Sequence, residues 1–143
     1  MASIKHYLII KATPQKVYDA ITLQEGLAGW WTEETVATPK MGAIIEFKFG
    51  DRYHNKMEVT ALEPTHRVTW RCLVGDEEWI GTRFVFELAE KKDQTVLRFT
   101  HSDWKSETDF FANCNYHWGY YLRSLKQYCE TGIGTPFTPD EAT

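Results

Sequence analysis

The sequence is poor in the residues that build covalent or metal frameworks. It contains three cysteines in 143 residues, and none of them belongs to a CxxC pair. An odd, sparse set of this kind argues against a disulfide framework and against a structural zinc site. Five histidines are scattered without an HExxH or HxxxH pair, and Cys114 with His117 supplies only half of a metal site. We therefore predict no metal and no cofactor.

Concentrated positive charge is also missing. The net charge is −4, and the longest basic run, Lys91-Lys92, is ended at once by Asp93. Nucleic-acid-binding domains normally carry a stripe of lysine and arginine, so we predict no nucleic-acid partner. Neither a glycine-rich phosphate loop nor a GxSxG nucleophile motif occurs, and we designate no residue as catalytic.

Long hydrophobic runs are absent as well. No stretch is apolar enough to cross a bilayer, and Met1-Ala2-Ser3 leads directly into a strand pattern rather than a signal segment. These absences favour a cytoplasmic protein that does not insert into a membrane.

Aromatic residues, by contrast, are abundant. They make up 15% of the chain, with six Trp, seven Tyr and eight Phe, and two of them are adjacent at Trp30-Trp31. Two neighbouring indoles bury a large area and leave one backbone segment in different directions. They therefore close either a core edge or the mouth of a cavity. We favour a place in the core or at a cavity rim over direct ligand contact, because large aromatic side chains are usually structural.

Residue periodicity predicts the order of the elements. Residues 4–11 have a strand pattern, and Thr13-Pro14 is a good start for a short helix that ends near Thr22. A second short helix follows and contains Trp30-Trp31. Apolar and polar residues then alternate in a six-strand antiparallel meander. Its clearest strands are residues 45–49, 57–61, 68–72, 82–88 and 97–101.

The last periodic segment predicts a long helix. Ser106 with Asp109 resembles a capping box at its start, and Gly132 is a natural stop. Residues 133–143 are predicted to form a polar tail, and the whole chain, 1–143, to form a single domain. The apolar stripe of the helix steps by three and four residues through Phe111, Cys114, Trp118, Leu122, Leu125 and Cys129.

These elements predict an α+β fold in which a curved antiparallel sheet wraps around the long helix. The helix stripe and the concave sheet face are both apolar, so laying one across the other hides both from water. A sheet that bends away from its helix leaves room for an internal cavity. The predicted order is one strand, two short helices, six strands and the final helix.

At this point the chain resembles a known family. It is similar to the helix-grip, START-related superfamily (SRPBCC), and within it to the C-terminal-type domain of the activator of heat shock protein 90 ATPase. The resemblance implies the helix-grip fold with an interior pocket for a small apolar molecule. The residues that carry it are Ala12-Thr13-Pro14, Val17-Tyr18-Asp19-Ala20, Leu27-Ala28-Gly29-Trp30-Trp31, Gly42, Ile45-Glu46-Phe47, Leu62-Glu63-Pro64, Val68-Thr69-Trp70, Thr95-Val96-Leu97-Arg98-Phe99-Thr100-His101 and the run from Trp118 to Lys126.

The candidate ligand-binding residues lie on the predicted inner faces. His101 is the most informative polar member, either as a hydrogen-bonded core histidine, which we favour, or as a general base. Hydroxyls such as that of Tyr121 offer polar contacts that would orient an apolar ligand. The full set is Trp30, Trp31, Phe47, Met57, Trp70, Phe84, Phe86, Phe99, His101, Trp118, Tyr121 and Leu122.

Three functions remain open at this stage. The first, which we favour, is binding of a small hydrophobic, lipid-like or aromatic ligand in the cavity. The second rests on the resemblance alone and is a chaperone partner that activates a heat-shock ATPase. The third is an enzyme of cyclase or hydrolase type that uses His101 and a tyrosine on an apolar substrate. We expect a monomer or a weak homodimer.

Overall fold

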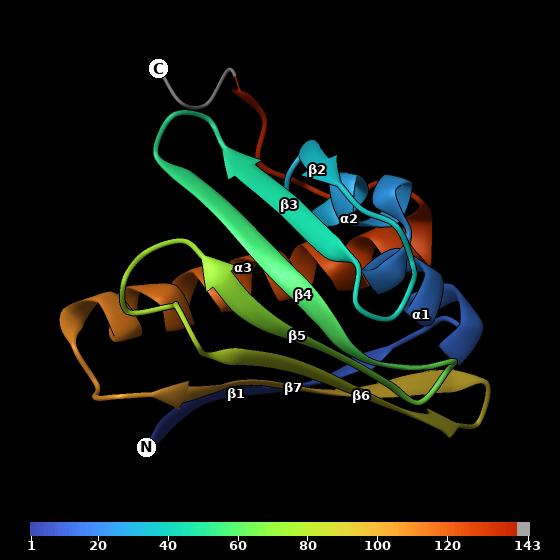
Figure 1. The fold of residues 1–143 in the computed structure, drawn as a ribbon. Coiled ribbons are helices and arrows are strands. Elements are labelled where there is room, and N and C mark those ends of the chain that lie inside the picture. Colours follow the sequence, from blue (N-terminus) through green and yellow to red (C-terminus); the bar gives the residue numbers. More distant parts are fainter. Residues whose placement is uncertain (140–143) are drawn as a thin grey trace.

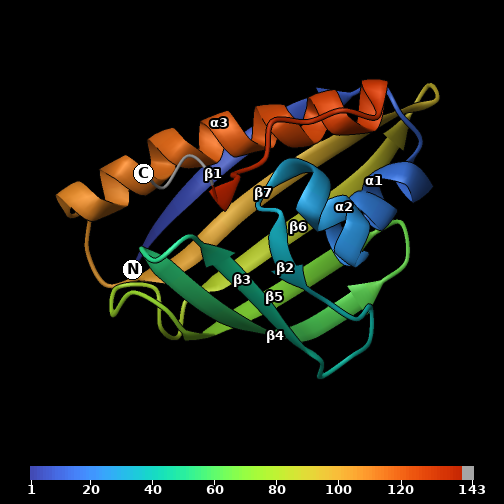
Figure 2. The same cartoon turned by 90° about the horizontal axis from the view of Figure 1, so that it is seen from above.

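A computed structural model describes residues 1–139 as a curved antiparallel sheet with three helices on one side (Figure 1 and Figure 2). The strand order is β1-β7-β6-β5-β4-β3-β2, so β2 to β7 form a meander and β1 pairs with β7. This is the predicted α+β helix-grip architecture and order of elements. The elements are β1 (Ala2–Ile10), α1 (Pro14–Thr22), α2 (Gln24–Trp30), β2 (Glu34–Val36), β3 (Ile44–Phe49), β4 (Tyr53–Glu63), β5 (Arg67–Val74), β6 (Arg83–Lys91), β7 (Gln94–Trp104) and α3 (Asp109–Thr131).

The two short helices begin and end where local chemistry directs. The Thr13 hydroxyl accepts a hydrogen bond from the Lys16 amide at 3.3 Å, and Pro14 occupies the first turn, as predicted. Leu23 ends α1 and also precedes α2, so the chain turns without a linker. The result is a compact helical corner whose second helix ends at Trp30.

The start of α3 differs from the prediction. The predicted capping box of Ser106 and Asp109 does not form. The helix begins at Asp109, and its cap is Thr108. Thr108 has an extended backbone, and its hydroxyl oxygen accepts from the Phe111 amide at 3.1 Å. The same hydroxyl donates to Glu78 at 2.6 Å, which ties the helix start to the β5–β6 loop. Gly132, with φ of 87°, ends the helix as expected.

Aromatic rings fill the centre of the interface between the sheet and α3. The ring of Trp118 lies 4.4 Å from that of Phe99 and 5.9 Å from that of Phe84, between centroids. Trp70 lies 5.0 Å from Phe86 and 6.1 Å from Trp31. Such pairs contribute roughly 0.5–1.5 kcal/mol each beyond the burial of their area. The middle of the concave face is therefore core.

One residue of β7 has a backbone conformation that L-residues rarely adopt. Asp103 has φ of 69°, beside the register irregularity between β1 and β7. Its carboxylate accepts a hydrogen bond from Arg83 Nε at 2.8 Å. Aspartate tolerates this conformation better than most residues, so the strand bends without a glycine.

Close approach of α1 and α2 generates a stability prediction. A Cβ on Gly26 would lie 2.7 Å from the Ala20 Cα and 2.8 Å from its carbonyl oxygen, which are backbone atoms that cannot rotate away. Gly26→Ala is therefore expected to cost about 1–3 kcal/mol in urea unfolding. The control is Gly119→Ala in α3, where the nearest atom, His6 Cε1, is 3.7 Å away. That variant is expected to gain about 0.5–1 kcal/mol. A stabilised Gly26→Ala would contradict the packing described.

Candidate functional site

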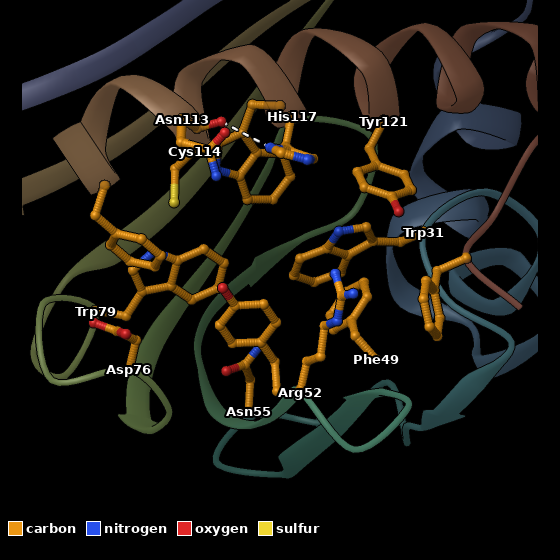
Figure 3. A pocket seen from close by; sticks show the side chains of 14 residues that line it. Trp31, Phe49, Arg52, Asn55, Asp76, Trp79, Asn113, Cys114, His117 and Tyr121 are labelled. Atoms are coloured by element: carbon orange, nitrogen blue, oxygen red, sulfur yellow. Dashed lines mark hydrogen bonds between the residues drawn. The ribbon is translucent and has the colours of Figure 1, made fainter. Parts of the chain in front are cut away.

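A pocket of about 230 Å³ lies at one end of the sheet–helix interface, between the first half of α3, the β3–β4 turn and the β5–β6 loop (Figure 3). Its volume is below the ~300–1,000 Å³ of ordinary ligand sites, so it suits a molecule of one or two rings. Aromatic side chains make most of its wall. The lining residues are Trp31, Phe49, Arg52, Tyr53, Asn55, Asp76, Trp79, Phe110, Asn113, Cys114, His117, Trp118, Tyr121 and Phe137.

One face of α3 forms the roof of this pocket. The lining positions on the helix are 110, 113, 114, 117, 118 and 121, which are spaced by one, three or four residues. That spacing places all six side chains on one side of a helix. The same face continues into the core, where Leu122 and Leu125 are fully buried. The pocket therefore lies beneath the end of the α3 apolar stripe that the centre of the sheet does not cover.

The β5–β6 loop holds Trp79 beside the α3 face of the pocket. The Asp76 carboxylate accepts from the Glu78 amide at 2.9 Å, and the Asp76 carbonyl accepts from the Trp79 amide at 2.8 Å. The Trp79 ring stacks at 6.5 Å from that of Trp118, with 11° between the planes. Two nearly parallel indoles, one on a loop and one on α3, thus belong to the same pocket wall.

A buried chain of hydrogen bonds connects these two tryptophans. The Trp118 indole N–H donates to His101 Nδ1 at 3.2 Å, so that nitrogen is an acceptor. His101 Nε2 then carries the proton and donates to the Thr82 hydroxyl at 2.9 Å. The hydroxyl in turn donates to the Trp79 carbonyl at 2.5 Å. Because an indole N–H can only donate, the bond from Trp118 fixes the direction of every other hydrogen bond in the chain.

His101 is a structural member of this chain. The residue is fully buried, and burial lowers the pKa of its imidazole well below its usual value, so the ring is neutral. Its two nitrogens are both engaged, and it does not line the pocket. The interpretation as a hydrogen-bonded core histidine is confirmed. A general base needs access to substrate, and His101 lies behind Trp79 and Trp118.

The structure brings three of the predicted ligand-binding residues to the pocket. Trp31 (3% exposed), Trp118 and Tyr121 line it. The remaining nine lie in the core between sheet and helices rather than on the pocket wall: Trp30, Phe47, Met57, Trp70, Phe84, Phe86, Phe99, His101 and Leu122. Among them, Trp30 donates its indole N–H to the Ala20 carbonyl at 2.8 Å and secures the helical corner.

Several lining residues were not found from the sequence. Asn113 and His117 lie on the same helix face as Cys114, so helical spacing alone would have located them. Arg52 and Trp79 lie in a turn and a loop, where no periodicity indicates the direction of a side chain. Residues 133–139 were expected to begin a polar tail. Instead, Phe137 bonds through its amide to the Trp31 carbonyl at 2.8 Å and lines the pocket. Residues 140–143 lie outside the described part.

The three cysteines are free and buried. Burial raises the pKa of the thiols of Cys72 and Cys129 to about 12, and that of Cys114 to about 11. Thiols with such pKa values are poor nucleophiles. Within residues 1–139, no three His, Cys, Asp or Glu side chains are grouped so that they could hold a metal ion. No helix in that range is both long and apolar enough to span a bilayer.

The sheet, the gripped helix and the aromatic pocket define a helix-grip domain. The chain belongs to the family described as Activator of Hsp90 ATPase homolog 1-like protein, which it matches over residues 11–130. No curated protein matches it.

Solved structures agree with this assignment. The Aha1 dimer from Colwellia psychrerythraea is 40% identical, with a TM-score of 0.85 over 94% of this chain and 100% of that one. The protein MLL2253 from Mesorhizobium loti is 18% identical, with a TM-score of 0.78 over 88% of this chain and 95% of that one. The protein BH1534 from Bacillus halodurans is 22% identical, with a TM-score of 0.73 over 91% and 98%. The last two show the fold alone.

Burial of His101 predicts a pH-dependent stability. The folded protein keeps the ring neutral, whereas the unfolded chain binds a proton near the usual pKa of about 6.5. Acid therefore favours unfolding, and stability is lost as the pH falls from about 6.5 toward the lowered pKa, by up to ~1.4 kcal/mol per pH unit. Urea unfolding between pH 7 and 5 measures this slope. His101→Gln is expected to flatten it, whereas the surface variant His66→Gln keeps it. An unchanged slope in His101→Gln would refute the assignment.

Proposed function

We propose that this protein binds a small hydrophobic, aromatic molecule in the pocket beneath α3. The observation that carries the proposal is the pair of near-parallel indoles of Trp79 and Trp118, joined by the buried Thr82–His101 chain. A buried hydrogen-bond network that orients side chains at an apolar pocket provides a preorganised surface for a flat ligand. Trp31, Trp118 and Tyr121 remain our proposed contacts from the sequence, joined now by Trp79 and Phe49.

The size of the pocket sets the expected affinity. A two-ring ligand of about a dozen non-hydrogen atoms, at roughly 0.5 kcal/mol per atom, gains about 6 kcal/mol. That free energy corresponds to a dissociation constant of a few tens of micromolar. Binding of this strength suits a carrier or sensor that exchanges its ligand. The reduced, buried cysteines favour a cytoplasmic location for this role.

Blocking the pocket mouth tests the proposal. Asn113 is an exposed α3 residue that lines the pocket, and Ala112 is its exposed neighbour that does not. We expect the uncharged two-ring fluorescent dye 2-naphthol to bind the wild type with a saturable change in its fluorescence. Asn113→Trp should weaken this binding at least about tenfold, because the indole occupies the ligand volume, whereas Ala112→Trp should bind as the wild type does.

Dye binding that is absent from the wild type, or equal in both variants, would count against the pocket as a ligand site. Mass spectrometry of the freshly purified protein under native conditions adds an independent reading, since a co-purified small molecule would be seen directly. The two substituted chains provide the matched comparison for that measurement as well.

A second candidate is favoured by the family and by the relative from Colwellia psychrerythraea, which is described as an Aha1 dimer. On this alternative the protein stimulates the ATPase of an Hsp90-type chaperone, and it self-associates weakly. Adding purified protein to the chaperone is then expected to raise ATP turnover severalfold in a phosphate-release assay. Turnover that stays at the basal value across a titration would exclude this function.

A further inference from the structure

Asn55 brings an unsatisfied amide to the pocket. It lies on the inner face of β4 with Met57 and Val59, and only 3% of its surface is exposed. Its carboxamide forms no hydrogen bond with any residue of the described chain, 1–139, although it lines the pocket. Its polar atoms are not among those sealed from solvent, so the amide is accessible from the pocket and available to a ligand.

The surroundings of Asn55 direct one side of that amide to the pocket. A Cβ on Gly75 would lie 2.7 Å from the Asn55 carbonyl oxygen, so the loop backbone closes on that oxygen. Figure 3 shows the amide nitrogen on the side of Arg52, away from Asp76. The group that faces the pocket is therefore a hydrogen-bond donor.

Among the residues of the described chain, 1–139, that line the pocket, one is a lysine or arginine: Arg52, in the turn before β4. Its guanidinium has no ion pair or side-chain hydrogen bond within residues 1–139. In Figure 3 the side chain rises beside Phe49 toward Trp31, and both Arg52 and Asn55 line the pocket. An arginine fork offers paired donors in the geometry that a carboxylate accepts.

Negative charge lies at the end of the pocket opposite Arg52. Asp76 lies beside Trp79, on the far side of the pocket from Arg52 (Figure 3). One of its oxygens already accepts from the Glu78 amide. His117 is engaged through Nδ1 with the Asn113 carbonyl at 2.8 Å. The pocket is thus polarised, and an anionic group on a ligand is favoured at the Arg52 end and disfavoured at the Asp76 end.

We propose that the ligand is a planar aromatic carboxylate. Its ring lies against the indoles of Trp31, Trp79 and Trp118, and its carboxylate accepts hydrogen bonds from the Arg52 guanidinium and the Asn55 amide. This assignment rests on the proposed function and specifies its ligand class. The net charge of −4 gives no long-range attraction for an anion, so recognition depends on these two donors.

Isothermal titration with a matched pair of probes tests the ligand class. The probes are 2-naphthoate and its uncharged isostere 2-naphthamide, at neutral pH and low salt. The wild type is expected to bind the carboxylate at least about tenfold more tightly than the amide. Arg52→Gln should weaken binding of 2-naphthoate far more than binding of 2-naphthamide, and so bring the two affinities close together. Arg71→Gln, which alters an exposed arginine on the outer side of β5, should keep it.

Asn55→Leu separates recognition from packing. Because Asn55→Leu breaks no hydrogen bond within residues 1–139, this variant is expected to be at least as stable as the wild type in urea and to bind 2-naphthoate several-fold more weakly. Equal affinity of the wild type for both probes, or unchanged 2-naphthoate binding in Arg52→Gln, would overturn the carboxylate assignment and leave the apolar pocket standing. If neither naphthyl probe nor 2-naphthol binds the wild type, the proposed function itself fails.

Discussion

Trp118 must both bury its ring and satisfy its indole N–H, and the rest of the structure is arranged around that double requirement. Its ring contacts Trp31 at 5.1 Å, Phe99 at 4.4 Å and Phe84 at 5.9 Å, which come from three separate elements. Its N–H has one buried acceptor, His101 Nδ1. A buried donor left unpaired costs about 1–3 kcal/mol, so the position of α3 over β7 is specified by this bond as well as by packing.

This constraint also decides where a ligand has room. Because Trp118, Phe99 and Trp70 fill the middle of the concave face, the open volume moves to the end of the interface, under the first turns of α3. There the walls come from loops, from the adjoining ends of β3 and β4, and from one face of α3. The pocket therefore combines rigid indoles, held by the core, with polar side chains of the β3–β4 turn.

The elements that could be predicted are those with a strong local signal. Thr13-Pro14 and Gly132 mark helix ends by their own chemistry, and the placement of His101 on an inner face followed from alternation along β7. The cap of α3 was misplaced because Ser106 and Thr108 are both plausible caps, and only the backbone path of the loop selects Thr108. The short strand β2 has three residues, too few for alternation to show.

The contacts of the pocket join residues that are far apart in the sequence, so local signals do not predict them. Phe137 reaches Trp31 across more than a hundred residues, and Thr82 reaches His101 across 19 residues. Local periodicity assigns a side chain to a face, but it contains no information about which distant side chain lies opposite. The order of elements and the apolar faces were thus encoded in residue spacing, and the family in motifs that resemble those of its members. Whether the concave face is hollow or filled, and which side chains surround the remaining space, depended on the tilt of α3 and the path of the loops, since both are set by packing across the whole chain.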